Sequence, residues 1–436
     1  MANQHPLNDK KTINAWALFD WANSAYALVI STAVFPIYFI KYTPDIITLG
    51  PMTFTNSALY TFAVTFSYII IASLSPLLSG IADFTGRRKF FLSMFTLIGS
   101  LSCISLYFFA GIPQLWLGTS SFILATIGFA GSLVFYDSYL PLIASEDQYN
   151  RVSAKGFIYG YIGSVILLIT ILTMIQRPEW FYITEWWSVK DGQLASRVGF
   201  VLVGLWWLGF SQYTFRNLPK DVYQKFTGNM ISQGYREIKN AYRKVKKETN
   251  LKRFLLAFFC YSAGVQTLIY LATVFAEKEL DFSTGELIGI VLLLQLVAIG
   301  GAYLFSAIGN KKGNKFSLLL MITIWFLICV AAYFTHTKGV FYIIAISVGM
   351  VMGGIQALSR ASYSMLLPEK DHDSTSYFSF YDVVYKLSIV GGTLLFGIVD
   401  NLTHSMRNSV LVLAVLFMLG FYFMTRTEIN PKSKTV

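Results

Sequence analysis

The chain has 436 residues, of which 55% are hydrophobic, 17% are aromatic and only 13% are charged. A soluble protein of this length needs far more charge to cover its surface, so this composition excludes an ordinary soluble globular protein. The net charge of +11 does not indicate a nucleic-acid partner, because the basic residues gather on one side of a series of apolar blocks.

Twelve apolar blocks follow one another along the chain, each of about 20 residues, the length that an α-helix needs to cross the hydrocarbon core. The blocks are Asn14–Ile40, Thr55–Ile81, Phe90–Ala110, Leu115–Tyr136, Gly156–Ile175, Val198–Phe215, Phe254–Phe275, Leu287–Ile308, Phe316–Phe334, Val340–Leu358, Phe378–Val399 and Ser409–Met424. The sequence therefore predicts an all-α, multi-pass integral membrane protein with twelve transmembrane helices. We expect it to be monomeric, in a bacterial inner membrane.

The basic residues orient these helices. When the loops are assigned in turn to two sides, 26 Lys and Arg fall on the side of the N-terminus, seven on the other side, and Lys386 lies inside a block. Cytoplasmic loops carry such an excess of positive charge. Both termini are therefore expected in the cytoplasm.

The longest polar segment lies between the sixth and seventh blocks, and it divides the chain into six-helix halves of residues 1–216 and 254–436. In the linker, residues 217–253, apolar residues recur every three or four positions and basic residues stand between them. This pattern predicts a basic amphipathic helix that lies along the anionic inner leaflet or along the underside of the protein, with anionic lipids as its expected partner. A solvated linker helix is an equal alternative.

A short motif is repeated at the same place in each half. The stretch GIADFTGRRK, residues 80–89, stands between the second and third blocks, and a weaker copy between the eighth and ninth places Asn310 at the position of Asp83 and Gly313 at that of Gly86. Duplicated halves that enclose a site at the midplane are typical of secondary transporters. The first copy resembles motif A of the major facilitator superfamily, whose pattern is G-x-x-x-D-x-x-G-R-[RK].

Four further stretches resemble the vacuole-effluxer-like branch of that superfamily, which is related to autophagy-linked fungal vacuolar amino-acid exporters. They are WALFDWANSAYALVISTAVFP (16–36), RVSAKGFIYGYIGS (151–164), GVQT (264–267) and GGIQALSRASYSMLLP (353–368). The resemblance implies two pseudo-symmetric halves and alternating-access export of small organic solutes, amino acids first, with no cofactor and with a proton gradient as a candidate driving force. Ala263 departs from the branch, which commonly has Asp there, and this puts the family's proton coupling in doubt.

The resemblance also implies a gate at the cytoplasmic face. Its expected residues are those of motif A and an acidic partner for Arg87 or Arg88, namely Gly80, Asp83, Gly86, Arg87, Arg88 and Asp137. Positive residues that merely orient the protein are the alternative. The gate is favoured, because orientation alone would not require Asp83 or the glycines.

Polar residues inside the blocks are expected to face water, ligand or one another, because a charge in lipid is costly. By resemblance, the first, fourth, seventh and tenth helices line the central cavity, which would aim Asp20, Asn23, Tyr26, Gln266 and Gln356 at the substrate. Arg360, Asp382 and Lys386 are expected to form an intramembrane charge network. For Asp382 and Lys386, which are four residues apart, a purely structural ion pair is an almost equal alternative.

The remaining function classes have little support. The four histidines, His5, His336, His372 and His404, lie in tails or loops, and neither H-E-x-x-H nor a P-loop occurs, so we expect no enzyme, no catalytic or metal-binding residues and no direct use of ATP. A proton-coupled nutrient uptake carrier and a non-transporting membrane sensor or scaffold stay open as alternatives.

Overall fold

The computed structural model describes residues 6–183, 193–221, 230–367, 374–403 and 405–429. Twelve helices in these ranges are long and apolar enough to cross a membrane, which confirms the predicted number. The helices of the first half are α1 (Lys10–Ala25), α2 (Phe35–Lys41), α3 (Asn56–Thr85), α4 (Arg88–Ser105), α5 (Leu115–Asp137), α6 (Leu140–Ile143), α7 (Tyr149–Gln176) and α9 (Gln193–Asn217). Those of the second half are α11 (Thr249–Leu280), α12 (Thr284–Lys312), α13 (Asn314–Tyr333), α14 (Lys338–Leu366), α15 (Ser374–Thr403) and α16 (Met406–Thr425).

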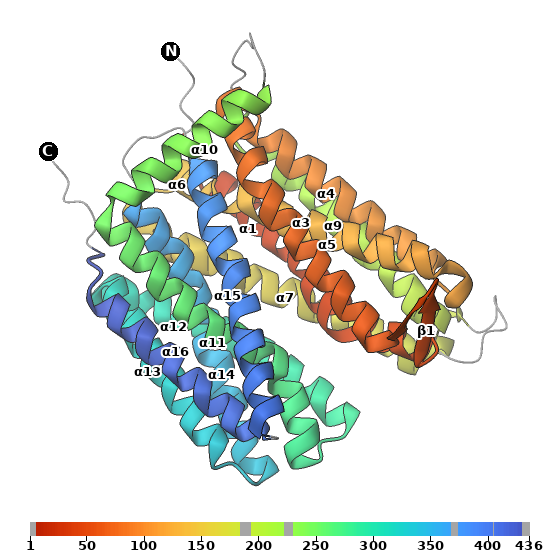
Figure 1. The fold of residues 1–436 in the computed structure, drawn as a ribbon. Helices are drawn as coiled ribbons and strands as arrows, with labels where there is room; N and C mark the ends of the chain where they lie inside the picture. Colours follow the sequence, from red (N-terminus) through yellow and green to blue (C-terminus); the bar gives the residue numbers. More distant parts are fainter. Residues whose placement is uncertain (1–5, 184–192, 222–229, 368–373, 404, 430–436) are drawn as a thin grey trace, which may run out of the picture.

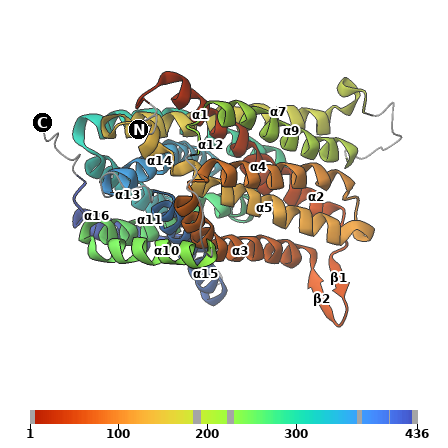
Figure 2. The ribbon, with the colours of Figure 1, turned by 90° about the horizontal axis from the view of Figure 1, so that it is seen from above.

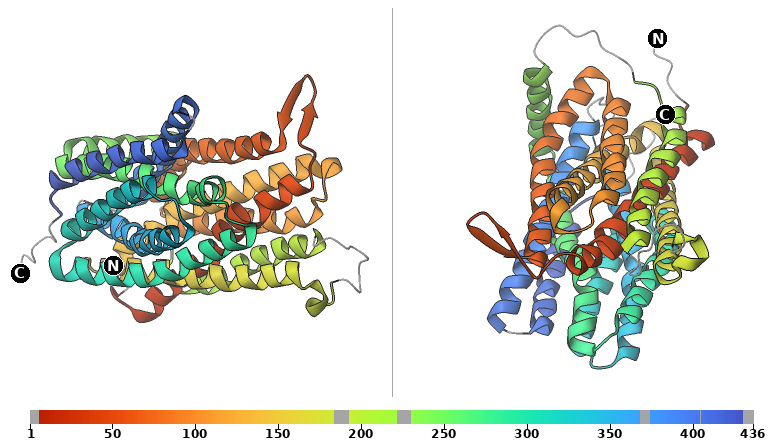
Figure 3. Two further views of the ribbon diagram at one scale, coloured as in Figure 1. Left: turned by 90° about the horizontal axis from the view of Figure 1, so that it is seen from below. Right: turned by 90° about the vertical axis from the view of Figure 1, so that its right-hand side faces the viewer.

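The two sets of helices form two bundles, which meet mainly where α7 packs against α12 and α14 and where α3 packs against α15. Helix α10 (Met230–Lys247) lies across one end of the molecule, where α1 begins and α16 ends (Figure 1). We call this end the α10 face. The strands β1 (Ile46–Leu49) and β2 (Met52–Thr55) project from the opposite end, the hairpin face (Figures 2 and 3). The bundles separate toward the hairpin face (Figure 1).

The first membrane span is not one regular helix. Between α1 and α2, residues Tyr26–Val34 form a π-helix, in which Thr32 Oγ1 also donates to Ala27 O, five residues back, at 2.8 Å. Pro36 follows at the start of α2 and has no N–H to continue the α-helical pattern. The sequence analysis predicted an unbroken helix here. Short π-segments occur often at functional sites.

The β-hairpin was not predicted. Ile46 pairs with Thr55 and Leu49 with Met52, so only Gly50 and Pro51 form the turn. Gly50 has φ +61°, a value that glycine adopts without strain. The β-branched residues before this turn were the available signal.

Helix α10 lies in the linker and has one buried and one exposed face. Gly234, Ala241 and Val245 are buried, at helical spacing, whereas Tyr235 and Tyr242 on the other face are 64% and 55% exposed. The buried face packs mainly against α3, and also contacts α11 and α15 of the second half. At its closest approach, a Cβ added to Gly234 would lie 2.6 Å from Cγ1 of Ile81 in α3. Helix α10 therefore bridges the two halves on one face.

Candidate functional site

Arg360 of α14 reaches from the second half into the first and is 3% exposed. Its Nη1 donates to Asp137 Oδ1 of α5 at 2.9 Å and lies 3.5 Å from Asp20 Oδ2 of α1. Its Nε and Nη2 donate to Oγ and O of Ser153 of α7, at 3.0 and 2.8 Å. We call Asp20, Asp137 and Arg360 the Arg360 cluster, since one guanidinium here ties together three helices of the opposite half.

Aromatic rings enclose this guanidinium. Its Cζ lies 4.3 Å from the ring centre of Phe157 and 4.7 Å from that of Trp16. Tyr136 donates to Asp20 Oδ2 at 2.7 Å. A cation held over aromatic faces away from water gains electrostatic attraction that an exposed cation would not. The cluster is therefore a buried contact between the halves, on the α10-face side of the membrane span.

The structure places Asp20 in this contact, whereas the sequence analysis expected it to face the substrate. Asp137 was expected to pair with Arg87 or Arg88, but its described partner is Arg360. Arg360 itself was expected to join Asp382 and Lys386, and no contact with either is described. The true pairings escaped the sequence analysis because Asp20 and Arg360 are 340 positions apart.

Motif A forms a second contact between the halves, at the end of α3. Gly86 has φ +68° and ends the helix, which allows Arg87 N to donate back to Ala82 O at 3.1 Å. Asp83 accepts from the backbone N–H of Ser376 at 2.7 Å, in the first turn of α15. A carboxylate at a helix N-terminus satisfies unpaired N–H groups and the helix dipole together.

Arg88 completes this contact. Its Nη2 donates to Asp83 Oδ1 at 2.8 Å and its Nε to Thr375 Oγ1 at 2.5 Å. Gly80 lies where α10 crosses, because a Cβ added there would collide with the carbonyl oxygen of Gly234. Arg87 is exposed. The predicted gate residues therefore occupy one face, with Asp83 and Arg88 between the halves and Gly80 under α10.

The weaker motif copy makes the pseudo-symmetric contact, between α12 and the start of α7. Asn150 Nδ2 donates to Asn310 Oδ1 at 2.9 Å, and Asn314 Nδ2 donates to Asn150 Oδ1 at 2.8 Å. Gly313, with φ +86°, ends α12 as Gly86 ends α3. The amides of Asn150, Asn310 and Asn314 thus occupy the position that corresponds to the contact between Asp83 and the N-terminus of α15. The sequence alignment of the two motifs could have drawn attention to Asn310, but gave no sign of Asn150.

Asp382 and Lys386 form a separate ion pair within α15, with Nζ of the lysine bonded to Oδ2 of the aspartate. Ser75 of α3, in the other half, lies 3.4 Å from the same oxygen. Both charged residues are buried. Each charge has its counter-charge one helical turn away, so the pair is neutral without any help from the opposite half.

The other predicted cavity residues differ in their surroundings. Tyr161 of α7 donates to Gln356 Oε1 of α14 at 2.7 Å, a further contact between the halves. Tyr26 is paired inside its own half, with its hydroxyl 2.7 Å from Thr126 Oγ1. Gln266 is buried on α11. Asn23 Oδ1 is buried and has no hydrogen-bond partner among the described residues.

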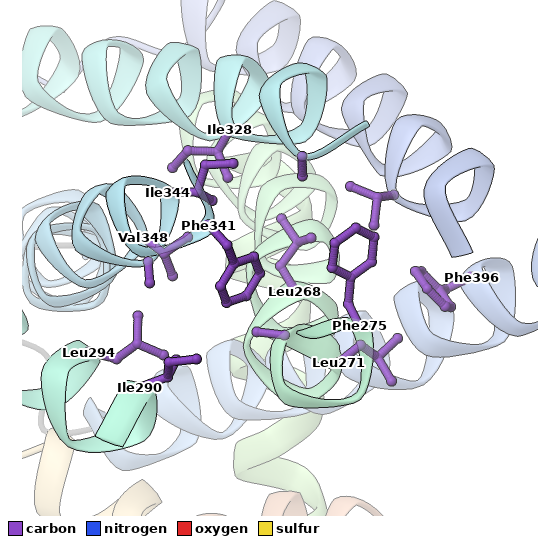
Figure 4. A pocket seen from close by; sticks show the side chains of 14 residues that line it. Leu268, Leu271, Phe275, Ile290, Leu294, Ile328, Phe341, Ile344, Val348 and Phe396 are labelled. Carbon is purple, nitrogen blue, oxygen red and sulfur yellow. The ribbon is translucent and has the colours of Figure 1, made fainter. Parts of the chain in front are cut away.

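A pocket of different character lies inside the second half (Figure 4). Side chains of α11, α12 and α14 line much of it, including Leu268, Phe275, Leu294 and Phe341, and every lining residue is apolar. A zwitterionic or charged ligand would lose its hydration there without gaining a polar partner. This pocket is therefore no candidate for binding a polar solute.

One residue of the linker holds the start of α4. Asp221 accepts from the backbone N–H groups of Lys89 and Phe90, at 2.8 and 3.1 Å. Burial raises the pKa of Asp221 above its ordinary value, and these two hydrogen bonds oppose that shift. Sequence reasoning missed this residue because the helix that it caps begins 133 positions earlier.

Comparisons with known proteins agree with this architecture. Residues 8–435 match the family model described as "Vacuole effluxer Atg22 like". The chain is 31% identical over 411 residues to the uncharacterized MFS-type transporter YxiO of Bacillus subtilis, covering 94% of this chain and 93% of that protein. It is 24% identical over 421 residues to autophagy-related protein 22 of Pichia angusta, covering 83% and 73%.

Solved structures of major facilitator transporters share the fold. The fucose transporter FucP in its outward conformation has a TM-score of 0.69 at 14% identity, over 96% of this chain and 98% of that chain. The human organic anion transporter MFSD10 has a TM-score of 0.73 at 10% identity, over 96% and 100%. At these identities the likeness concerns the fold alone.

Proposed function

Because the chain belongs to the vacuole effluxer Atg22-like family of major facilitator transporters, we propose that it is a secondary active transporter that exports amino acids or similar small organic solutes by alternating access. The main support for this proposal is that the polar contacts between the halves gather on one side of the molecule. The Arg360 cluster, the Asp83–Ser376 contact and the Asn150–Asn310 contact all join the halves near the α10 face. Polar contacts of this kind can break and re-form, as a rocking motion of two bundles requires.

We assign the α10 face to the cytoplasm, since the excess of Lys and Arg lies on that side. The molecule is then closed toward the cytoplasm. We further propose a bacterial inner membrane as its location, since the relative YxiO comes from a bacterium. The family's name, vacuole effluxer, supports export.

Polar groups along the halves support a zwitterionic substrate. Asn23 Oδ1 is a buried acceptor without a partner among the described residues, and Gln266 and Gln356 add amide groups on α11 and α14. An ammonium group needs acceptors and a carboxylate needs donors, and amides supply both. An amino acid therefore suits these side chains better than it suits the apolar pocket of Figure 4.

Counterflow in proteoliposomes tests the transport activity. Vesicles are loaded with unlabelled amino-acid mixtures and supplied with radiolabelled ones outside, with and without a pH gradient. We expect accumulation by the wild type, and a loss of at least about tenfold for Asn23→Ala, because removing a polar contact to substrate typically costs about 1.4 kcal/mol or more. Gly300→Ala, at a site with open space around it, is the matched control. No accumulation of any amino acid by folded wild type would contradict the proposed substrate class.

Anionic lipids are the partner that we propose for α10. Its exposed face combines Tyr235 and Tyr242 with Arg236, Arg243 and Lys246, and aromatic and basic side chains together favour the lipid headgroup region. Nothing beyond one chain is needed to complete the contacts described above, so we propose a functional monomer. Thermal unfolding of the purified protein in nanodiscs of rising phosphatidylglycerol content tests the lipid preference. We expect the lipid to stabilise the wild type more than a variant in which Arg236, Arg243 and Lys246 are neutralised.

A further inference from the structure

The Arg360 cluster holds two carboxylates but only one guanidinium. Both carboxylates approach the same nitrogen, Nη1, with Asp137 Oδ1 at 2.9 Å and Asp20 Oδ2 at 3.5 Å. Neither acid receives a two-pronged contact, because both approach Nη1 while Nε and one N–H of Nη2 donate to Ser153. One positive charge is therefore shared between two acids in a buried site.

No second cation of the described chain compensates the extra acid. The other ionisable groups that act on the cluster are Tyr136, Tyr161, Tyr381, Tyr385 and Asp382. Phenols stay neutral near pH 7, and Asp382 is an acid that already has Lys386. On α7, Lys155 bonds to Asn14 instead.

The surroundings also limit the water that could supply the missing compensation, since the side chain of Asp137 is 18% exposed and Asp20 and Arg360 are buried. Asp20 is 5% exposed, and a Cβ added to Gly156 of α7 would lie only 2.6 Å from Asp20 Oδ2 and 2.9 Å from Arg360 Nη2. A buried negative charge without a counter-charge is costly, and binding a proton removes it. Two acids that share a site hold such a proton jointly.

We propose that the Arg360 cluster holds one exchangeable proton between Asp20 and Asp137 while the α10 face is closed, and that opening of this face releases the proton. The inference rests on the proposed alternating access. Arg360 belongs to the second half and both acids to the first, so opening withdraws the guanidinium and admits water. The O–H bond of the shared carboxylic acid then breaks, the proton passes to water at the α10 face, and two hydrated carboxylates are left.

This exchange gives the gate a defined pH dependence. The closed state binds one proton more than the open state, so raising the pH disfavours the closed state. Over the pH range in which the closed cluster keeps its proton and the open acids have lost theirs, the closed-to-open ratio should fall about tenfold for each pH unit, and above that range it should level off. The dependence should vanish below about pH 4, where the hydrated acids of the open state are protonated as well.

Distance measurements between nitroxide labels test the coupling without any substrate. The buried cysteines Cys103, Cys260 and Cys329 are replaced by alanine, and labels are attached at the exposed positions Arg216 and Lys312, one in each half. We expect the closed population of the wild type to fall as the pH rises from about 5 to about 9. Asp20→Asn and Asp137→Asn should each give a nearly flat profile, because either closed cluster is then neutral without a proton.

Two further variants separate this effect from a loss of folding. Asp45→Asn, an exposed acid near the hairpin, should keep the wild-type slope. The double variant Asp20→Asn/Asp137→Asn leaves Arg360 without any acid, so it should populate the open state at every pH. In parallel, infrared difference spectra at neutral pH should show a protonated carboxyl band in the wild type that both single variants lack.

The pH dependence of the closed population and the infrared band of the protonated carboxyl group decide the proposal together. The proposal is overturned if the wild type shows neither, or if the pH dependence persists in both single variants. Should the slope and the band be present while counterflow of amino acids is absent, the proton site would stand and the proposed substrate class would fail.

Discussion

The carboxylate of Asp83 and the backbone N–H of Ser376 lie 2.7 Å apart and belong to different halves of the molecule. The pseudo-symmetric position to Asp83 is occupied by Asn310, which bonds to Asn150 at the start of α7. One helix terminus is therefore held by a charge and the other by neutral amides. The charged contact is the stronger, since hydrogen bonds to an ionised acceptor gain about twice the energy of neutral ones.

Asp83→Asn should weaken the closed state. The variant loses the charge that faces the α15 terminus and leaves Arg88 without its counter-charge, a cost of about 2 kcal/mol, or roughly 30-fold in the closed-to-open ratio. Thiol labelling of a cysteine placed at Ser138, buried beneath this contact, should become correspondingly faster. Asp45→Asn, which removes the same charge from an exposed site, should leave the rate unchanged. Equal rates in Asp83→Asn and the wild type would show that this contact does not hold the gate.

Gly156→Ala should disturb the Arg360 cluster directly. The added methyl would lie 2.6 Å from Asp20 Oδ2 and 2.8 Å from the Tyr136 hydroxyl. Overpacking of this kind costs about 1–3 kcal/mol, and here the cost falls on the closed state. The label distances described above should report a larger open population. Gly300→Ala adds the same methyl on α12 where there is space for it, so it should resemble the wild type, and a matching shift in Gly300→Ala would point to a general effect of helix rigidity.

The sequence predicted the twelve spans because bilayer thickness alone sets the length of an apolar block. The amphipathic α10 was equally predictable, since its periodicity is local. An interruption inside a span was harder to predict. Pro36 marks the end of the π-helix, but no residue before it indicates that the α-helix becomes a π-helix at Tyr26.

The site was predictable only in part. The sequence identified Asp20 and Arg360 as charged residues inside the spans and Asp137 as a gate residue, yet it could not pair them, because the pairing depends on which helices meet across the two halves. The contact of Gly156 with the Arg360 cluster depends on the position of α7 against both α1 and α14, and the spacing of residues within α7 does not encode this position.

The Asp382–Lys386 pair should prove structural. Asp382→Asn or Lys386→Met alone strands a buried charge, so each should lower the free energy of unfolding by about 3–5 kcal/mol. The double variant Asp382→Leu/Lys386→Met removes both charges and should recover most of that loss. Thermal unfolding in detergent measures the recovery. Counterflow by the recovered double variant should stay near the wild-type rate, whereas a stable double variant without transport would assign the pair to substrate or ion binding.

Detaching α10 should favour the open state, because this helix seats on α3 of one half and contacts α11 and α15 of the other. Gly234→Val places a branched side chain where even a Cβ would meet Ile81 Cγ1 at 2.6 Å, so the helix must shift at a cost of about 1–3 kcal/mol. We expect faster proteolysis within α10 and a larger open population in the label distances. Ser232→Val, on the exposed side of the same helix, controls for the introduction of a branched side chain into α10. If Gly234→Val increases proteolysis but leaves the open population unchanged, α10 is a passive linker that does not help to hold the halves together.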